Sequence, residues 1–412
     1  MDVIAAFLAL TAGFAYLNAR FLKLPMTIGV MAFALGISLL LVAINAAGYL
    51  PAVRAYEESL LRSVDFSELL MQGMLSFLLF AGALGVDLRR LRAFRFQVAA
   101  LAIFGTALST VLVGAALWWA LPWVGLSLSL PHCLLFGALI SPTDPIAVLG
   151  ILKSAGAPED LELVITSESL FNDGVGVVLF VLMLGLTASG TTPTMGEAGM
   201  LLLREAGGGI LFGLALGFVG FRLMRSIDHY EAEVLITLAM VVGGYALASH
   251  LHVSGPLAMV VAGVLTGNQS RELAMSDETR HHVDAFWHLI DGILNAVLFV
   301  LIGMEVLIVP YDVGLLPAAI LVIAVTLLAR FLTAGLPVLL MHDTFGLPSG
   351  SWRVLSWSGL RGGISVALVL SLPAGEARSV LIPLTYCVVV FSILCQGLTI
   401  GTVVRHSIKP AA

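Results

Sequence analysis

The sequence has few charged residues. Only 11% of its 412 residues are Asp, Glu, Lys or Arg, whereas a typical soluble domain has about 25%. Acidic residues number 26 and basic residues 20, so the chain also lacks the basic excess that marks a nucleic-acid-binding protein. The composition therefore excludes an ordinary soluble domain and gives no reason to expect a nucleic-acid partner.

Cysteine is also scarce. The three cysteines, Cys133, Cys387 and Cys395, lie in apolar runs without the spacing of metal ligands, which argues against a disulfide framework or a zinc site. The N-terminal run, residues 3–17, has no basic segment before it. We therefore expect it to form a first membrane span and not a cleaved signal peptide.

Hydrophobic residues, in contrast, make up 59% of the chain, and the mean hydropathy is +1.04. A helix needs roughly 20 apolar residues to cross a bilayer, and backbone polar groups in lipid have to be paired within the helix. The sequence therefore predicts an all-α polytopic membrane protein. Its Pro, Gly and polar residues divide it into thirteen expected spans: 2–20, 24–48, 68–86, 96–121, 131–150, 162–187, 198–224, 232–250, 254–268, 285–308, 313–341, 351–373 and 377–404.

Basic residues in the connecting loops predict the orientation, because loops rich in Lys and Arg stay in the cytoplasm. The loops after odd-numbered spans and the C-terminal tail hold fourteen of them: Arg20, Lys23, Arg89, Arg90, Arg92, Arg95, Lys153, Arg222, Arg225, Arg271, Arg280, Arg353, Arg405 and Lys409. The opposite side holds four: Arg54, Arg62, Arg204 and Arg378. We expect a plasma (inner) membrane protein with its N-terminus outside and its C-terminus in the cytoplasm.

Three spans each contain a short stretch that resembles one in the span seven places later. These similarities pair residues 24–36 with 255–267, 80–88 with 299–307, and 141–148 with 358–365. Because an odd offset reverses the direction of a helix in the membrane, the sequence predicts an inverted-topology repeat, an architecture typical of secondary transporters. The single transport domain would comprise a first repeat of six helices, a linker helix and a second repeat, at 1–187, 198–224 and 232–404.

Two spans at matching repeat positions contain helix breakers. "SPTDP" (141–145) has two prolines without an amide hydrogen, and "GLRGG" (359–363) has three flexible glycines. A simple kink is the alternative for either span alone, but the matched pair predicts two discontinuous helices that cross. Asp144 and Arg361 would compensate the partial charges of the half-helix ends, and carbonyls freed near Thr143 could coordinate a cation.

The sixth span carries the polar stretch "ESLFNDGVGVVLF" (168–180). In a helix Ser169 and Asp173 share one face, and Glu168 and Asn172 lie on the adjacent stripe. Ser169 and Asn172 could simply join helices by hydrogen bonds. An ionisable residue such as Asp173 within a span indicates a functional site, and the face offers the oxygen ligands that a hard cation prefers.

The number of acidic and basic residues within the spans predicts the charge of the ion that the site binds. Three acids and two bases lie there: Asp144, Glu168, Asp173, Arg330 and Arg361. One negative charge is left without a protein partner, so one monovalent cation or one proton would complete the site. This predicts electroneutral one-for-one exchange, although Asp291 would change the count if it also lies within a span.

At these residues the sequence resembles the monovalent cation–proton antiporter family, in the branch of the NhaP-like proteins and sodium–proton exchangers. The resemblance covers the whole chain and is most specific at "SPTDPIAVL" (141–149), "ESLFNDGVGVVLF" (168–180) and "GLRGGISVALVLSLP" (359–373). "FAGALGVDLRRL" (80–91) and "ARFLT" (329–333) support it more weakly. It implies a transporter and not an enzyme, an NhaA/NhaP-like fold and a homodimer, with no cofactor besides the transported Na+ and H+.

The resemblance also implies roles for individual residues. Asp173 would be the ion-carrying carboxylate, and Asn172 before it marks the electroneutral branch. The Na+ ligands would be Asp173, Ser169 and the backbone carbonyl of Thr143, supported by Asp144.

Two arginines receive structural roles from the same resemblance. Glu168 would form a buried pair with Arg330, and Arg361 would sit at the helix crossing. Some family members use an acid in the third span, where this sequence has Ala81, so a ligand from that helix is not expected.

A second group of polar residues follows one face of the tenth span. Asp284, His288, Asp291 and Asn295 have helical spacing and could line a cytoplasmic ion funnel, and His281, His282 and His288 could respond to pH. The alternative is that these residues face the membrane interface, which we favour for the histidines.

We expect alternating access in which Asp173 binds either a cation or a proton. Na+ is the first candidate, with Li+ or K+ as alternatives. A K+/H+ antiporter and a Na+-coupled symporter of an organic anion are rival functions on the same fold. An intramembrane enzyme is less expected, because HExxH and GxGD motifs are absent from the sequence, and a channel is disfavoured because no ring of filter residues stands out.

Overall fold

The computed structural model of the chain describes residues 2–46, 73–189, 195–305 and 313–408, and these ranges form helices without any strand. The α-helices are α1 (Asp2–Leu17), α2 (Met26–Ala46), α5 (Leu75–Leu84), α6 (Leu88–Ala99), α7 (Thr106–Ala120), α8 (Leu130–Ile140), α9 (Ile146–Ser154), α10 (Glu159–Ser189), α11 (Met195–Leu202), α12 (Gly208–Met224), α13 (Tyr230–His250), α14 (Gly255–Leu265), α15 (Arg271–Leu273), α16 (Asp277–Glu305), α17 (Leu316–Arg330), α18 (Leu336–Leu340), α19 (His342–Phe345), α20 (Ser351–Trp357), α21 (Gly363–Leu370), α22 (Glu376–Phe391) and α23 (Gly397–Ser407). The predicted all-α architecture is confirmed.

Several expected spans consist of two α-helices joined by a π-helical turn. Thus η3 (Ala100–Gly105) joins α6 to α7, η5 (Leu203–Gly207) joins α11 to α12, and η9 (Ser392–Gln396) joins α22 to α23. Each of the thirteen expected spans overlaps a helix of the described chain. Eight helices there are long and apolar enough to cross a membrane, and three other apolar helices are shorter, so the number of crossings stays a prediction.

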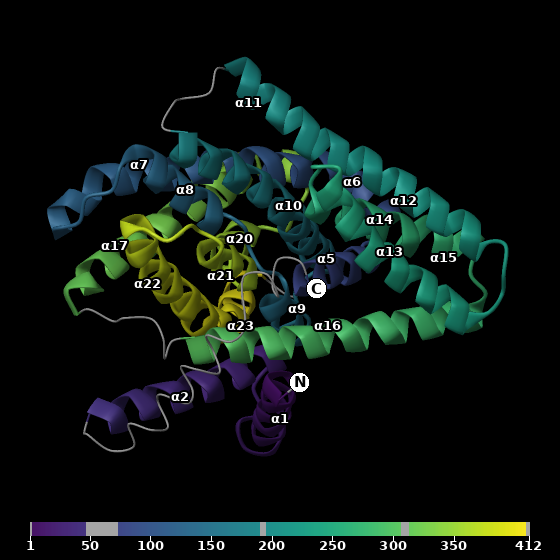
Figure 1. Ribbon diagram of the computed structural model, residues 1–412, viewed down its shortest axis with the longest axis horizontal. Helices are drawn as coiled ribbons and strands as arrows, with labels where there is room; N and C mark the ends of the chain where they lie inside the picture. Colours follow the sequence, from purple (N-terminus) through teal and green to yellow (C-terminus); the bar gives the residue numbers. More distant parts are fainter. Residues whose placement is uncertain (1, 47–72, 190–194, 306–312, 409–412) are drawn as a thin grey trace.

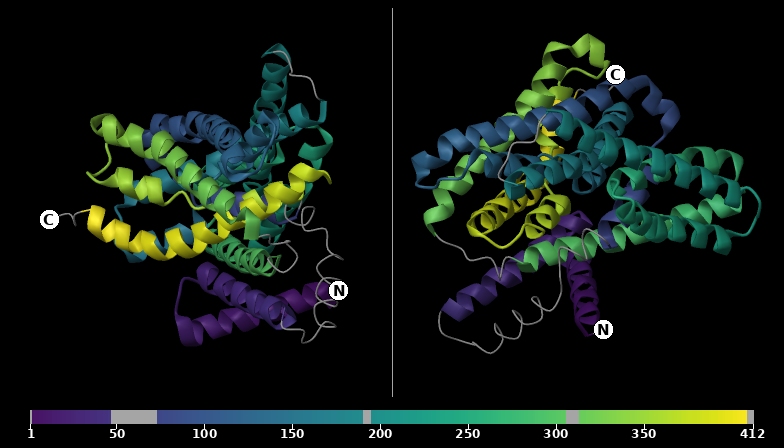
Figure 2. Two further views of the ribbon diagram at one scale, coloured as in Figure 1. Left: turned by 90° about the vertical axis from the view of Figure 1, so that its left-hand side faces the viewer. Right: turned by 45° about the horizontal axis from the view of Figure 1, so that its top comes forward.

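The long helix α16 separates the first two helices from most of the others (Figures 1 and 2). Along its second half α16 packs closely on α2, because Gly303 has no side chain at the point where the two backbones approach. A Cβ atom at Gly303 would overlap the 31–35 stretch of α2. A second close approach joins α14 to α5 at Gly263, and Gly267, in the π-helical turn η6 (Thr266–Ser270) that follows α14, also lies against the end of α5.

The helix α10 lies at the centre of the remaining bundle (Figure 1) and packs against α5, α8, α14 and α21. Its apolar residues contribute to both buried hydrophobic clusters of the described chain, Leu161 and Leu170 to one, Val177 and Phe180 to the other. The polar residues of α10 are therefore held between two apolar regions, on a helix that is packed along its length.

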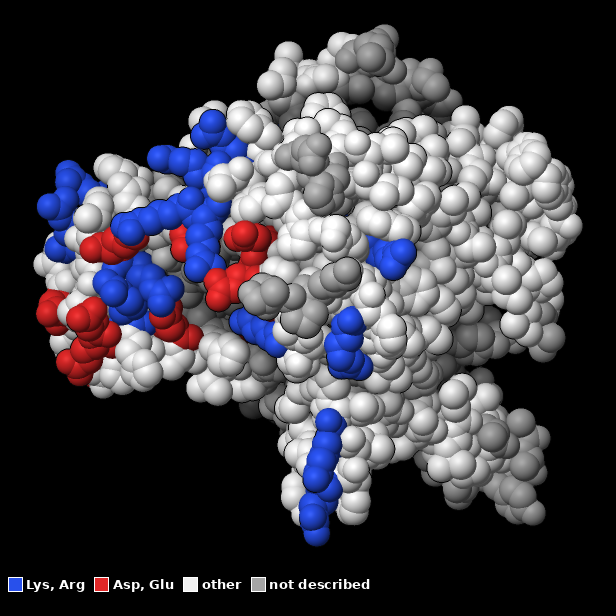
Figure 3. Space-filling model, turned by 180° about the vertical axis from the view of Figure 1, so that it is seen from behind, with Lys and Arg blue, Asp and Glu red and all other residues white. Residues whose placement is uncertain are grey.

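Charged side chains gather at one end of the molecule, while most of the face seen in Figure 3 has none. Ion pairs join residues in or near the first or last turns of helices: Arg89 with Glu272 at 2.8 Å, Arg90 with Glu159 at 2.5 Å, and Arg271 with Asp284. The first two pairs connect the loop after the third expected span to the loops after the fifth and ninth. These three loops therefore meet on one side of the helices.

Candidate ion-binding site

Two helices are interrupted and cross at their interruptions. The helix α8 ends at Ile140 and α9 begins at Ile146, while α20 ends at Trp357 and α21 begins at Gly363. The backbone N–H of Asp144 in the first break donates a 2.7 Å hydrogen bond to the carbonyl of Leu360 in the second. The crossing is therefore fixed by a direct backbone contact.

The charged residue in each break compensates the end of the opposite half-helix. The Arg361 guanidinium donates from Nη1 to the carbonyl oxygens of Ser141 and Pro142, at 2.6 Å and 3.0 Å, where α8 ends with a partial negative charge. The Asp144 carboxylate lies against Gly362 at the beginning of α21, so close that a Cβ atom on that glycine would overlap it. That end carries a partial positive charge.

Glu168 on α10 has a partner of its own. Its two carboxylate oxygens each accept a 2.8 Å hydrogen bond from a different terminal nitrogen of Arg330, and both side chains are buried. Arg330 also donates from Nε to the carbonyl of Leu355. This bidentate geometry is the strong form of a charge-assisted hydrogen bond.

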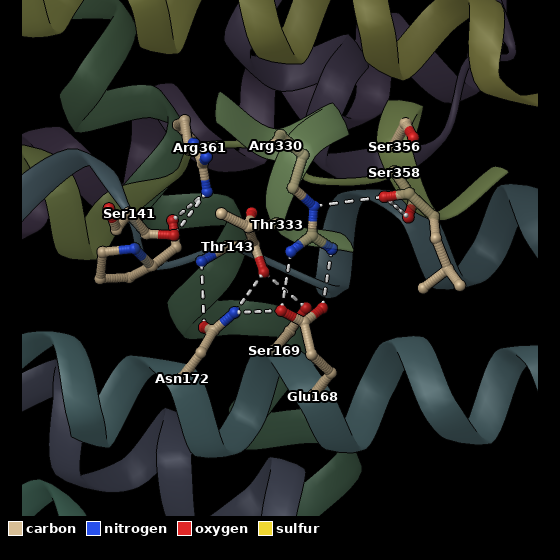
Figure 4. A network of polar contacts seen from close by, with 12 residues as sticks. Ser141, Thr143, Glu168, Ser169, Asn172, Arg330, Thr333, Ser356, Ser358 and Arg361 are labelled. Carbon is tan, nitrogen blue, oxygen red and sulfur yellow. Dashed lines mark hydrogen bonds and ion pairs between the residues drawn. The ribbon is translucent and has the colours of Figure 1, made fainter. Parts of the chain in front are cut away.

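Asn172 connects α10 to the break after α8 (Figure 4). Its amide nitrogen donates to Thr143 Oγ1 and to Glu168 Oε1, each at 2.8 Å, and its amide oxygen accepts the Thr143 N–H at 3.1 Å. The Thr143 hydroxyl is also 2.9 Å from the Ser169 hydroxyl. Four of the residues singled out in the sequence thus form one buried network with Arg330.

Asp173 lies next to this network but outside it. The side chain is 6% exposed, and its Oδ1 atom has no hydrogen-bond partner among the described residues. It borders a cavity of about 60 Å³ together with Thr143 and Asp144. A void of about 10–15 Å³ holds one water molecule, so this cavity has room for a cation together with water molecules.

The helix α5 supplies only an apolar wall to the cavity. Its described lining residues are Leu75, Leu78, Leu79 and Gly82. Ala81, also on this helix, has no side-chain oxygen. No side-chain ligand from this helix is present in the described lining.

Two further polar residues line the same cavity, Asn295 of α16 and Ser365 of α21. Sequence reasoning assigned Asn295 to a funnel and did not single out Ser365. The only sequence signal for Ser365 is a hydroxyl in an apolar run, four residues after Arg361 and hence one helical turn from a break.

The predicted funnel residues on α16 differ in their surroundings. Asp284 is paired with Arg271, His288 is exposed, and Asp291 is half-buried and accepts a 3.0 Å hydrogen bond from Asn295. Asp291 lies within α16 but does not line the cavity beside Asp173. The funnel remains a prediction.

The three histidines lie on the exposed side of α16. His281 and His282 are in edge contact, and His282 stacks on Tyr230 with 4.2 Å between ring centroids. Across the described ranges, no group of three or more His, Cys, Asp and Glu side chains could hold a metal ion. Their response to pH stays a prediction.

Comparison with known proteins identifies relatives along the whole chain. The sequence model "Sodium/hydrogen exchanger, transmembrane" matches residues 5–406. The Na+/H+ antiporter NhaP of Pseudomonas aeruginosa is 50% identical over 410 residues, which cover 98% of this chain and 96% of the relative. The Na+/H+ antiporter NhaH of Halobacillus dabanensis is 35% identical over 364 residues, covering 86% and 87%.

A solved structure supports the fold independently. The sodium proton antiporter MjNhaP1 of Methanocaldococcus jannaschii, determined at pH 8, superposes with a TM-score of 0.76 over 99% of both chains at 20% sequence identity. The resemblance noted from the sequence motifs is thereby confirmed. The chain is an integral membrane protein that belongs to the sodium/hydrogen exchanger family, a family of transporters and not of enzymes.

Proposed function

We propose that this protein exchanges Na+ for H+ across the plasma membrane, one for one, with Asp173 as the group that binds either ion. The observation that supports this most is the Asp173 carboxylate, which is buried beside a cavity and has an oxygen without a hydrogen-bond partner among the described residues. Relatives named as Na+/H+ antiporters, up to 50% identical, support the choice of ions.

The surrounding charges support electroneutrality. Glu168 is neutralised by Arg330, and Asp144 and Arg361 carry opposite charges at the crossing. Asp291, half-buried on α16, accepts a hydrogen bond from Asn295 and does not line the cavity. One cation or one proton on Asp173 would therefore leave the crossing and the cavity without net charge.

The ligands that we propose for Na+ are the carboxylate of Asp173, the hydroxyl of Ser169 and the backbone carbonyl of Thr143. All three residues are buried, and oxygen ligands suit a hard cation. Asn172 would hold Thr143 in position, and Asp144 would add negative charge beside the cation. Glu168 and Arg330 would serve as a structural pair.

Competition at one carboxylate would couple the two ions. At high proton activity Asp173 would be protonated, and at low proton activity it would bind Na+. A bare carboxylate is costly in an apolar barrier, so only the occupied site would move to the other side. This restriction makes each Na+ that crosses in one direction exchange for one proton in the other.

We also propose the arrangement of the chain in the membrane. Two inverted repeats, 1–187 and 232–404, would flank a linker helix at 198–224. Support comes from the packing of α2 on α16 and of α14 on α5, since the repeat relates these two contacts to each other. The N-terminus would lie outside and the C-terminus in the cytoplasm, and the protein would act as a homodimer.

The experiment that tests the function measures the collapse of a pH gradient in everted vesicles when NaCl, LiCl, KCl or choline chloride is added, with the membrane potential clamped. We expect NaCl to collapse the gradient without any organic substrate. A response to KCl alone would identify a K+/H+ antiporter. A requirement for an organic anion would identify a symporter.

A further inference from the structure

We propose that Ser365 and Asn295 supply two further oxygen ligands to the cation that binds at Asp173. This inference rests on the proposed function and extends its binding site to α16 and to the second broken helix. The three residues line one cavity, and each has a buried side-chain oxygen without a hydrogen-bond partner among the described residues: Asp173 Oδ1, Asn295 Oδ1 and Ser365 Oγ.

Buried polar atoms without partners are rare in proteins, because each one loses its hydrogen bonds to water. Three such oxygens around one cavity of about 60 Å³ therefore need a common explanation. Asn295 and Ser365 are each only 1% exposed, and Asp173 is 6% exposed. A bound cation would satisfy all three oxygens at once, and two of them are neutral oxygens of the kind that coordinate hard cations.

The position of Ser365 explains why its hydroxyl is unpaired. A serine within a helix ordinarily donates to the carbonyl three or four residues earlier. For Ser365 those residues are Gly362 and Arg361, which precede the first residue of α21, Gly363. Gly362 has φ −133° and ψ −148°, outside the helical region, and the Ser365 hydroxyl has no hydrogen-bond partner among the described residues. The break in the helix therefore leaves this oxygen for a ligand.

The orientation of the Asn295 amide is fixed by its neighbours. The amide nitrogen donates to the backbone carbonyl of Asp291 at 2.8 Å and to the Asp291 carboxylate at 3.0 Å. Both of these partners are acceptors, so the NH2 group has to face them and the carbonyl oxygen has to face away. Asn295 Oδ1 is thus the atom left without a partner at the cavity.

Because its ligands would come from three helices, a bound cation would hold these helices together. Asp173 is on α10, Ser365 on α21 and Asn295 on α16. A cation held by all three would tie the second broken helix to the long helix that packs on α2. A proton on Asp173 alone would leave Ser365 and Asn295 unbound, so the two occupied states would differ in how tightly α16 is held.

The test compares Ser365→Ala and Asn295→Ala with wild type in two measurements on purified full-length protein. The first is thermal stability in detergent as NaCl replaces choline chloride at constant ionic strength, because a ligand that binds the native state raises the melting temperature. The second is Na+-driven proton movement in proteoliposomes. Ser371→Ala is the matched control, because Ser371 directly follows α21, its hydroxyl donates to the carbonyl of Leu368, and it does not line the cavity.

We expect the Na+ concentration for half-maximal stabilisation and for half-maximal exchange to rise about tenfold in each variant, the effect of losing one hydrogen bond or ligand to a charged group. The control should stay within about twofold of wild type. If wild type responds to Na+ and both variants match it within about twofold, the inference is wrong while the proposed function stands. If wild type itself neither gains stability with Na+ nor moves protons, the proposed function fails and the inference fails with it.

Discussion

Arg330 and Glu168 meet in the interior of the bundle through two parallel 2.8 Å hydrogen bonds, one from each terminal nitrogen of the guanidinium to each carboxylate oxygen. Both side chains are buried, so neither charge has bulk water as an alternative partner. The pair joins α17 to α10 and leaves the charge on Asp173, five residues further along α10, as the one that a transported ion can neutralise.

Replacing Arg330 with alanine should destabilise the protein. The substitution leaves Glu168 buried without its partner, which costs about 3–5 kcal/mol. We expect a lower melting temperature and poorer recovery of Arg330→Ala from the membrane, measured by fluorescence-detected gel filtration after heating. The double variant Arg330→Met with Glu168→Leu should regain much of the loss, because it removes both charges. A single variant as stable as wild type would refute the structural role.

Changing Asn172 to aspartate should also weaken the fold. The ionised carboxylate cannot donate to Thr143 and Glu168, as the amide does, and it places a like charge one helical turn from Glu168. We expect a loss of about 2 kcal/mol or more at alkaline pH. The loss should shrink in acid, because a protonated carboxyl can donate again. Equal deficits at pH 5 and pH 8 would contradict this reading of the network.

Arg361→Gln should separate ion binding from transport. Glutamine can still donate to one of the carbonyls at the end of α8, but the positive charge is gone. We expect the occupied site to keep one net negative charge and the maximal rate of exchange in proteoliposomes to fall at least tenfold. The Na+ concentration for half-maximal exchange should fall as well, since the removed charge repels the cation. A variant with a wild-type rate, or with weaker Na+ binding, would argue against Arg361 as the positive charge that balances Asp144 at the crossing.

Much of the fold follows from local features of the sequence. Hydropathy located the helices, and the prolines of "SPTDP" and the glycines of "GLRGG" predicted both interruptions, because these residues act on the backbone within a few positions. The π-helical turns such as η3 and η9 have no comparable signal. The number of membrane crossings does not follow from helix length either, since α5 and α8 are only 10 and 11 residues long.

The site was predictable where charge identifies a residue. Glu168, Asp173, Arg330 and Arg361 stand out because charge is rare in an apolar chain. Ser365 and Asn295 do not stand out, because hydroxyl and amide groups are common in membrane helices and usually bond to nearby backbone or side-chain groups. Only the packing of α16 and α21 around the cavity shows that these two oxygens have no hydrogen-bond partner in the described part of the chain.

The central claim is that Asp173 carries the transported ion, and Asp173→Asn tests it most directly. Asparagine has nearly the same shape but neither the charge that binds Na+ nor the site that takes a proton. The control is Asp160→Asn, at an exposed position in the first turn of the same helix. In proteoliposomes with an imposed pH gradient and a clamped potential, adding NaCl should collapse the gradient for wild type and the control and leave it unchanged for Asp173→Asn, although that variant folds. Na+-driven proton movement by Asp173→Asn at a rate near wild type would contradict the account.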